Sequence, residues 1–329
     1  MTTTSVKIGT RGSKLALSQT RQITDQLNAV GGFEAELVTI KTDGDVLTGP
    51  LSQMGGTGVF AAELRSAVLD GRVDVAVHSL KDLPTAAVPG LAIAAVPVRA
   101  DARDALCSRD GLTLAELPHG ATVGTGSPRR AAQLLAARPD LAIVDIRGNV
   151  ETRLGRVPGL AGNPVKEAVP GKVGDLDAVV LAAAGLSRIG RLEAVTEFLS
   201  VDVMLPAPGQ GALALECRTD STDLTSVLGQ SLAAVDDHDT RLAVTAERAL
   251  LARLEAGCAA PVGALGHRKG SMLHLETVVV SLDGTRSLRL KKATDGLTTV
   301  GATLLGIELA EELLAAGAGE LADLAGSSK

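Results

Sequence analysis

The order of strand-like and helix-like segments limits the possible folds of this chain more than any other feature. In the first hundred residues, short apolar runs alternate with stretches in which apolar residues recur every three or four positions. The runs typical of strands are 6–11, 34–40, 73–77 and 91–98, and the stretches typical of helices are 14–30 and 58–69. This β-α-β-α-β order predicts an α/β domain with helices covering a mostly parallel sheet.

A second set of the same kind follows. Its predicted strands are 122–124, 141–146 and 176–181, and its predicted helices are 127–137, 150–156 and 182–199. Residues 157–174 contain four Gly and three Pro, which predicts a loop. After a Pro- and Gly-rich turn at 205–212, we expect a strand over 213–218 that returns to the first sheet.

The last third of the chain has a different pattern. It predicts a long amphipathic helix over 236–256, a hairpin around Asp283-Gly284 and a final helix over 301–315, which together indicate a small α+β domain. A length of 329 residues allows two or three domains. We predict domain 1 (α/β, discontinuous) from 1–98 and 206–230, domain 2 (α/β) from 99–205, and domain 3 (α+β) from 231–329.

Composition excludes several classes of function. The chain has three Phe, no Tyr and no Trp, so base or sugar stacking on aromatic side chains is disfavoured. A net charge of −6 disfavours a general nucleic-acid or anionic-membrane binder. We find no secretory signal, no apolar run of transmembrane length and three cysteines without metal-ligand spacing. We therefore expect a cytoplasmic protein with reduced thiols, no metal, and neither nucleic acid nor membrane as a partner.

Arginine is concentrated in the second set of segments. Residues 99–156 contain nine Arg and no Lys. Several arginines follow predicted strands, where the ligand crevice of an open α/β sheet lies: Arg11, Arg129, Arg130, Arg147, Arg153 and Arg188. Because a guanidinium matches carboxylate and phosphate geometry, these residues predict a crevice for a ligand with several negative groups. The alternative for any single arginine is an exposed surface ion pair.

Two further residues are candidates for chemistry. Asp82 follows an apolar strand beside Lys81, where a carboxylate could stabilise a cation or move a proton, although a turn or N-cap role is the more common one from local sequence alone. Cys258 follows Gly257 on a predicted loop and is more available than Cys217, which lies in a predicted strand. The alternative for Cys258 is an inert buried thiol.

Six ordered motifs resemble the hydroxymethylbilane synthase family, also called porphobilinogen deaminase. They are IGTRGSKLAL (8–17), VHSLKDLP (77–84), VGTGSPRR (123–130), IRGNVETRL (146–154), LPAPGQGA (205–212) and EAGCAAPV (255–262). The resemblance implies two α/β domains like the lobes of a periplasmic binding protein, with the active site between them, and a smaller α+β C-terminal domain. Thr57 departs from the family, which often has Lys in this Gly-rich loop.

The resemblance also implies an activity. Enzymes of this family condense four porphobilinogen molecules head-to-tail into hydroxymethylbilane (preuroporphyrinogen), releasing ammonia, in porphyrin and haem biosynthesis. The chain elongates on a dipyrromethane cofactor that the enzyme makes from its own substrate. Each porphobilinogen carries an acetate and a propionate, so the growing chain is a polycarboxylate that the arginines would bind. The implied protein is a monomer that hands its product to uroporphyrinogen-III synthase.

Carried onto this sequence, the resemblance implies a set of site residues. Asp82 is the implied catalytic carboxylate, and Cys258 the implied thioether attachment of the cofactor. The residues implied to bind the cofactor are Lys81, Ser13, Ser79, Asp82, Thr125, Ser127, Arg129, Arg130, Arg147, Gly148 and Asn149. Those implied to bind substrate are Arg11, Phe60, Arg147, Arg153, Arg188 and Gln210.

Two other functions are consistent with parts of the sequence. A two-lobed receptor for a polyanionic solute would have the same α/β lobes and the same arginine turns. A nicotinamide-dependent dehydrogenase would also have α/β domains, but the Gly-rich turns at 55–58 and 124–126 are not GxGxxG. A mass increment on Cys258 would distinguish the transferase from the receptor, and a nucleotide titration would test the dehydrogenase.

Overall fold

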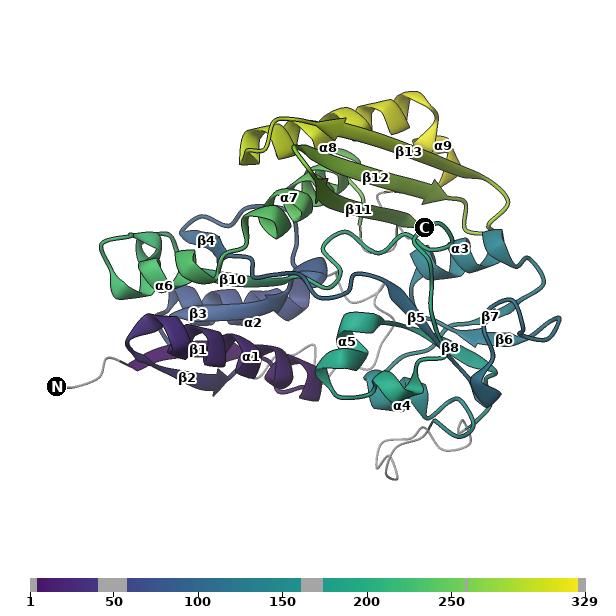
Figure 1. Ribbon diagram of the computed structural model, residues 1–329, viewed down its shortest axis with the longest axis horizontal. Helices are drawn as coiled ribbons and strands as arrows, with labels where there is room; N and C mark the ends of the chain where they lie inside the picture. The colour runs from purple at the N-terminus through teal and green to yellow at the C-terminus, as the bar shows by residue number, and fades with distance from the viewer. Residues whose placement is uncertain (1–4, 41–57, 161–173, 258–259, 325–329) are drawn as a thin grey trace.

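The computed structural model describes residues 5–40, 58–160, 174–257 and 260–324, without the side chains of 58–60. Three sheets organise these residues, and Figure 1 shows the first two side by side with the third lying across them. The predicted fold class, two α/β units and a smaller α+β unit, is confirmed by this arrangement. No helix of the described residues is long and apolar enough to cross a membrane.

The first sheet has the strand order β2-β1-β3-β10-β4. Its strands are β1 (Ser5–Thr10), β2 (Glu34–Thr39), β3 (Val75–Ser79), β4 (Leu91–Ala95) and β10 (Leu213–Arg218). β10 pairs antiparallel with both β3 and β4, whereas β1 pairs parallel with β2 and β3. The expected return of the chain to the first sheet at 213–218 is therefore confirmed, and four of the five strands run in one direction.

Helices cover this first sheet. α1 (Lys14–Gly31) begins at the N-cap Ser13 and packs against β1, β2 and β3 through buried residues that include Ile23 and Leu27. α2 (Gly58–Leu69) packs against β1, β3 and β10, and α6 (Val227–Val235) packs against α1 and β4. The short 3-10 helix η3 (Leu80–Asp82) follows β3, and η6 (Thr219–Thr222) follows β10.

The second sheet has a matching plan, with the order β7-β6-β8-β5-β9. Its strands are β5 (Asp104–Ser108), β6 (Thr122–Gly124), β7 (Ala142–Val144), β8 (Ala178–Ala182) and β9 (Glu197–Phe198). β5 pairs antiparallel with β8 and β9, so each sheet receives one antiparallel strand directly after the chain crosses over from the other. Its helical segments are α3 (Pro128–Ala137), α4 (Val150–Leu154), α5 (Ala183–Arg188), η4 (Arg109–Gly111) and η5 (Leu192–Ala194).

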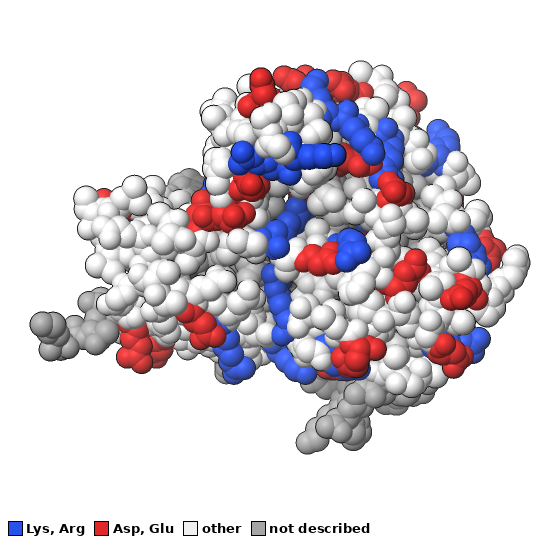
Figure 2. Space-filling view, in the orientation of Figure 1, with Lys and Arg blue, Asp and Glu red and all other residues white. Residues whose placement is uncertain are grey.

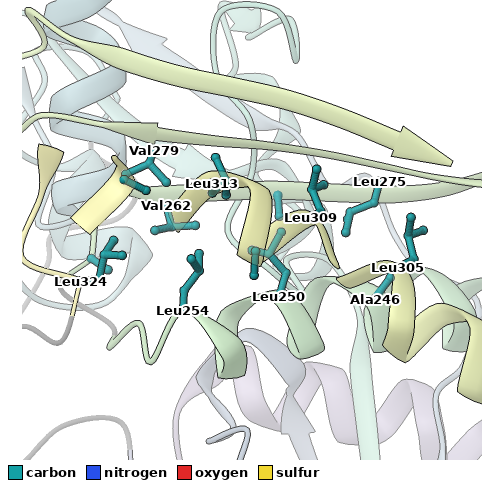
Figure 3. Close-up of a cluster of buried hydrophobic side chains, with 14 of the residues drawn as sticks. Ala246, Leu250, Leu254, Val262, Leu275, Val279, Leu305, Leu309, Leu313 and Leu324 are labelled. Atoms are coloured by element: carbon teal, nitrogen blue, oxygen red, sulfur yellow. The ribbon is translucent and has the colours of Figure 1, made fainter. Parts of the chain in front are cut away.

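The third sheet, β11-β12-β13, is antiparallel and has helices on one face. Its elements are β11 (Val262–Lys269), β12 (Met272–Val280), β13 (Ser287–Thr294), α7 (His238–Arg253), α8 (Thr299–Ala315) and α9 (Ala318–Leu321). Figure 3 shows the core, in which Leu250 of α7, Leu309 of α8 and Leu275 of β12 meet. Burial of this apolar cluster stabilises the unit, at about 25 cal/mol per Å² of apolar surface removed from water.

The structure corrects several predicted elements. The predicted helix over 182–199 is wrong beyond Arg188, because Gly190 adopts a positive φ of 72° and the chain continues as η5 and β9. β5, β11 and α6 were not predicted. The helix predicted over 236–256 ends at Arg253, and the hairpin predicted around Asp283-Gly284 is confirmed between β12 and β13. Most of the predicted loop at 157–174 lies outside the described residues.

Candidate active site

The candidate site begins where β3 ends and η3 carries Lys81 and Asp82 toward the second sheet. The Asp82 side chain is exposed and Leu80 is buried beneath it. Leu80 N donates to the Ala212 carbonyl at 3.0 Å, and Arg248 of α7 donates to the carbonyls of Leu83 and Pro84 at 2.8 Å each. Asp82 is therefore presented to solvent on a short turn that is anchored on both sides.

Lys81 lies half-buried beside Asp82 and faces the second sheet. Its Nζ lies 3.5 Å from Gln210 Oε1. Burial lowers the pKa of Lys81 to about 8; Asp82 and Asp104 act against this shift, whereas Arg130 and Arg129 add to it. Four charged groups from both α/β units therefore act on one amine. At neutral pH this amine is still mainly protonated and can bind an anion.

Arg129 and Arg130 lie in the first turn of α3, which is capped by Ser127, and both are buried. Asp104 lies between them: Arg130 Nη2 is 2.7 Å from Asp104 Oδ1, and Arg129 Nη1 is 2.8 Å from Asp104 Oδ2. Each guanidinium also donates to a carbonyl, Arg129 to Leu205 O at 2.5 Å and Arg130 to Val180 O at 3.1 Å. Arg129 and Arg130, which were predicted to bind a ligand, therefore already form an ion pair and a backbone hydrogen bond each within the protein.

Asp104 is the site residue that sequence reasoning missed. The signal available was a carboxylate at the first position of an apolar segment, Asp104–Ser108, but its partners Arg130 and Gln210 lie 26 and 106 positions away in sequence. Burial alone would raise the pKa of Asp104, but Arg129 and Arg130 hold that pKa well below its usual range. The carboxylate is therefore charged throughout the physiological pH range.

Gln210 joins the two α/β units at this point. Its Nε2 donates to Ala102 O at 2.8 Å and to Asp104 Oδ1 at 2.9 Å, while its Oε1 faces Lys81. The residue is buried, and both ends of its amide contact protein groups. The structure thus places Gln210 at the seam between the two α/β units, with its amide directed into the protein.

The turn after β7 brings a second group of predicted residues together. Asn149 caps α4 by accepting from Thr152 N at 2.9 Å, and Gly148 has a φ of 102°, a conformation that side chains rarely adopt. Arg147 is more exposed and lies 3.5 Å from Asp145 Oδ2. Arg153 Nε donates to Gly148 O at 2.8 Å. These contacts fix the turn while leaving the Arg147 guanidinium accessible.

Arg153 is the residue that ties this turn to η3. Burial, together with the nearby charges of Arg130 and Arg147, lowers the pKa of Arg153 to about 10, and Asp145 and Asp82 act in the opposite direction. Arg153 therefore lies within electrostatic range of Asp82, although the two residues belong to different α/β units. The structure thus brings Asp82, Lys81, Arg130, Arg147 and Arg153 into one region.

Arg188 lies at the same seam, where it contacts the segment that returns to the first sheet. Arg188 Nη2 donates to Gly211 O at 2.8 Å, and burial lowers the pKa of Arg188 to about 10. Its Nε is buried and makes no hydrogen bond within the described residues. Arg11 is half-buried directly after β1. Figure 2 shows Lys and Arg side chains aligned along the seam between the halves that carry the first and second sheets.

Several predicted polar residues have local structural contacts. Ser13 Oγ accepts from Ala16 N at 3.2 Å, and Thr125 Oγ1 accepts from Ser127 N at the same distance. Ser79 exchanges hydrogen bonds with Gln19. Such hydroxyls can still donate to a ligand, because a hydroxyl has one donor hydrogen and two acceptor positions.

Two predicted residues cannot be placed. Cys258 lies outside the described residues, as does the side chain of Phe60. The two other cysteines are free and buried, and burial raises the pKa of Cys107 to about 12 and that of Cys217 to about 11. Neither is a reactive thiolate at neutral pH. Among the described residues, no group of three His, Cys, Asp or Glu side chains could hold a metal ion.

The donor set of this region fits a polycarboxylate such as dipyrromethane. Cationic side chains outnumber carboxylates around Asp82, and a buried Nε of Arg129, like that of Arg188, makes no hydrogen bond within the described residues. Buried polar groups without partners are rare in proteins, so these N–H groups are suited to a bound anion. Chains of pyrroles with acetate and propionate arms present such anions.

Comparison with known proteins gives one consistent answer. The family model "Porphobilinogen deaminase, dipyromethane cofactor binding domain" matches residues 6–226, and "Porphobilinogen deaminase, C-terminal domain" matches residues 241–315. The chain is 54% identical to a porphobilinogen deaminase of Cutibacterium acnes, covering 98% of each chain. It is 52% identical to one of Micrococcus luteus, covering 95% of this chain and 93% of the relative.

Similarity to solved structures is much lower. The methionine binding protein MetQ has a TM-score of 0.40 and 14% sequence identity, over 70% of this chain and 89% of that one.

Proposed function

Because the chain belongs to the porphobilinogen deaminase family, we propose that Asp82 is its catalytic carboxylate and that the surrounding cations bind the pyrrole carboxylates. The activity is that of porphobilinogen deaminase, or hydroxymethylbilane synthase, in tetrapyrrole biosynthesis with a dipyrromethane cofactor. The receptor and the dehydrogenase considered from sequence are therefore set aside. What remains to be assigned is which residues carry the reaction.

One observation carries the assignment of Asp82. It is the exposed carboxylate at the end of η3, and the charges of Lys81 and Arg153 act together with it from the two sides of the seam. When ammonia leaves porphobilinogen, the substrate carbon becomes electron-deficient. A carboxylate held beside it stabilises that positive charge and can accept the proton released from the pyrrole ring. The bound cofactor supplies the nucleophilic pyrrole carbon at its free end.

The cations have a different role, which is to bind and orient. We assign Arg129, Arg130, Arg147 and Lys81 to cofactor carboxylates, with Ser13, Ser79, Thr125, Ser127, Gly148 and Asn149 supplying hydrogen bonds. Arg11, Arg147, Arg153, Arg188, Phe60 and Gln210 are assigned to the substrate. A guanidinium binds a carboxylate through two parallel hydrogen bonds, so it fixes orientation as well as position. Support comes from the gathering of most of these cations along one seam.

Cys258 is assigned as the attachment point of the cofactor. Cys107 and Cys217 are disfavoured because both are buried and have raised pKa values. The attachment is tested by the intact mass of the purified protein. We expect the wild type to be heavier than the sequence by two linked pyrrole units, and Cys258→Ser to lack that increment.

The matched controls are Cys107→Ala and Cys217→Ala, each of which should retain the full increment. A wild-type chain that stays unmodified after incubation with porphobilinogen would remove the proposed attachment. An increment that persists in Cys258→Ser would move the attachment to another residue.

We also propose a cytoplasmic monomer that passes its product to uroporphyrinogen-III synthase, with neither nucleic acid nor membrane as a partner. Two free, buried thiols are typical of proteins in a reducing compartment. Sedimentation of the holoenzyme tests the monomer: a mass of one chain is expected, and a concentration-independent dimer would contradict it.

A further inference from the structure

Asp104 has more contacts than an ordinary ion pair. Its Oδ1 accepts from Arg130 Nε at 2.9 Å, Arg130 Nη2 at 2.7 Å and Gln210 Nε2 at 2.9 Å, and its Oδ2 lies 2.8 Å from Arg129 Nη1. Asp104 is 0% exposed, and Arg129 and Arg130 are 4% and 6% exposed. A carboxylate has about four acceptor positions. Asp104 Oδ1 therefore accepts from Arg130 and Gln210, whereas Oδ2 contacts Arg129 as an ion pair that lacks hydrogen-bond geometry.

Such an arrangement is not explained by stability alone. Removing a carboxylate from water costs several kcal/mol, and a well-packed apolar group is often as stabilising as a buried ion pair. Two adjacent guanidiniums on one helix also repel each other. The benefit of Asp104 is instead geometric, because it orients Arg130 through two of its nitrogens and holds Arg129 Nη1 within ion-pair distance.

The same carboxylate reaches the other α/β unit through an amide. Gln210 Nε2 donates to Asp104, and Gln210 Oε1 faces Lys81 Nζ at 3.5 Å. Two crossing segments connect the first and second sheets: the outgoing one runs from β4 to β5, and the returning one from β9 to β10. Gln210 lies on the returning segment, and Asp104 begins β5 directly after the outgoing segment. Asp104, Gln210 and Lys81 thus form a continuous chain of contacts from α3 to η3.

We propose that Asp104 is a positioning residue that presets the orientation of Arg129 and Arg130 and, through Gln210, the place of Lys81, so that pyrrole carboxylates meet an already oriented set of cations. The proposal rests on the assignment of those three cations to ligand carboxylates. Both guanidiniums keep N–H groups that Asp104 does not use, including the buried Arg129 Nε. Asp104 therefore orients the pair without consuming its capacity for a ligand.

A purely electrostatic role and a positioning role of Asp104 predict opposite changes in the KM of Asp104→Asn, so the direction of that change tests the proposal. Lys81, Arg129 and Arg130 with Asp104 are three cations and one carboxylate, with a net charge of +2. Asp104→Asn would increase the positive charge, so a purely electrostatic role predicts a lower KM for porphobilinogen, which is an anion. A positioning role predicts a higher KM, because the two guanidiniums lose their shared counter-ion and one of them meets an amide N–H group instead.

The ionisation of Lys81 gives a second readout. The groups acting on Lys81 are Asp82 beside it, Arg129 and Arg130 of α3, and Asp104 of β5; of the two carboxylates that raise its pKa, Asp104→Asn removes one. The amine then loses its proton at lower pH, and the alkaline limb of the pH–rate profile moves to lower pH. Asp104→Glu keeps the charge, so its alkaline limb should stay close to that of the wild type.

The experiment compares holoenzymes of the wild type, Asp104→Asn and Asp104→Glu, with cofactor content fixed by intact mass. kcat and KM for porphobilinogen are measured from about pH 6 to pH 10, where a lysine of lowered pKa titrates. We expect Asp104→Asn to lower kcat/KM by about tenfold to a hundredfold, the effect of a misplacement of about 1 Å. Most of this loss should be in KM, together with the shift of the alkaline limb.

The matched control is Asp101→Asn. Asp101 lies on the outgoing segment between β4 and β5, is exposed, and pairs with Arg103 at 2.6 Å. This variant should have wild-type kcat, KM and pH profile. Asp104→Asn with a KM equal to or below that of the wild type, or with an unshifted alkaline limb, overturns the proposal. The proposal is also overturned if the loss of activity in Asp104→Asn is fully accounted for by a smaller fraction of folded, cofactor-loaded protein.

If Asp104→Asn does not load cofactor, Asp104→Glu decides. A raised KM with an unshifted alkaline limb supports positioning, and unchanged kinetics overturn it. Failure of both variants to accumulate as folded protein also overturns it, because the carboxylate is then needed for folding itself. Arg130→Gln in the same series tests the separate assignment of Arg130 to ligand carboxylates. A wild-type KM in Arg130→Gln would reject that contact independently of the result for Asp104.

Discussion

Arg99 and Glu247 form a bidentate ion pair that joins the outgoing segment between β4 and β5 to helix α7. Arg99 Nη1 lies 2.5 Å from Glu247 Oε1, and Nη2 lies 3.2 Å from Oε2. Glu247 is 0% exposed and also accepts from Gly209 N at 2.6 Å and from Gly266 N at 2.7 Å. One carboxylate thus binds both crossing segments and β11, and so holds the third sheet against the other two.

Glu247→Gln should destabilise the protein strongly. The substitution leaves Arg99 without its counter-ion at a largely buried position and, because a glutamine amide keeps only one oxygen, removes the acceptor of one of the two backbone N–H groups of Gly209 and Gly266. Breaking a buried pair in this way costs about 3–5 kcal/mol. Chemical denaturation measures the free energy of unfolding. The control is Glu311→Gln, whose partner Arg253 is exposed and which should lose less than about 1 kcal/mol. Equal losses in the two variants would contradict the role given to Glu247.

Much of the fold follows from periodicity. Residues 58–69 and 213–218 were predicted with the bounds that the structure has, because their apolar spacing is regular and turn residues flank them. Periodicity failed after Arg188. The apolar residues at 192, 195 and 199 keep a helical spacing, but Gly190 turns the chain, and Leu199 is buried beside β5 instead. Tertiary contacts decided that segment.

The site divides in the same way. Arginines that follow strands mark the crevice, because parallel strands end at one edge of a sheet. The residue that orients two of them was missed, since a contact between position 104 and positions 129 and 130 has no local signature. Pairing across the sequence is a property of the fold, so Asp104 and Gln210 became recognisable as partners only in three dimensions.

Asp82→Asn should form holoenzyme but turn over slowly. The amide has nearly the shape of the carboxylate but neither its charge nor its basicity, so it can neither stabilise a cation nor take up a proton. We expect kcat to fall by about 10²–10⁴-fold, the usual contribution of a positioned acid or base. Asp70→Asn, an exposed carboxylate after α2, should leave kcat unchanged. A near-normal kcat with full cofactor content would remove Asp82 from the catalytic role.

Lys81 predicts an alkaline limit for substrate binding. Its amine is charged below its pKa, which burial lowers to about 8, so binding of carboxylates should weaken as pH rises through that value. Lys81→Arg is the test, because a guanidinium stays charged and should move the rise in KM to higher pH. If the wild type and Lys81→Arg have the same alkaline limb, another group is responsible.

The lowered pKa of Lys81 also affects stability: binding of carboxylates should weaken as pH rises, whereas the contribution of Lys81 to the free energy of unfolding should increase. Between pH 8 and the ordinary lysine value of 10.5, the unfolded chain binds more protons at Lys81 than the folded protein does. The free energy of unfolding contributed by this group therefore rises with pH across that window. The comparison is made on cofactor-free protein, with Lys81→Met as the variant that should lack this rise.

Gly306 lies where α8 packs directly against the backbone of α7. A Cβ at this position would overlap the Ala246 carbonyl oxygen and lie 2.8 Å from Leu250 N, both of which are backbone atoms that cannot turn aside. Gly306→Ala must therefore push the two helices apart and open the core shown in Figure 3. Overpacking of this kind costs about 1–3 kcal/mol, which exceeds the helical preference of Ala over Gly of about 1 kcal/mol.

Gly319→Ala is the matched control, because this glycine of α9 has nothing within 4 Å of a built Cβ. It should be neutral or slightly stabilising, whereas Gly306→Ala should lower the thermal midpoint of the cofactor-free protein by several degrees, at roughly 2–4 °C per kcal/mol for large domains. Because α7 ends at Arg253, shortly before Cys258, the displaced helix should also slow cofactor loading, as followed by intact mass. A Gly306→Ala protein as stable as Gly319→Ala would show that the two helices can separate at no cost.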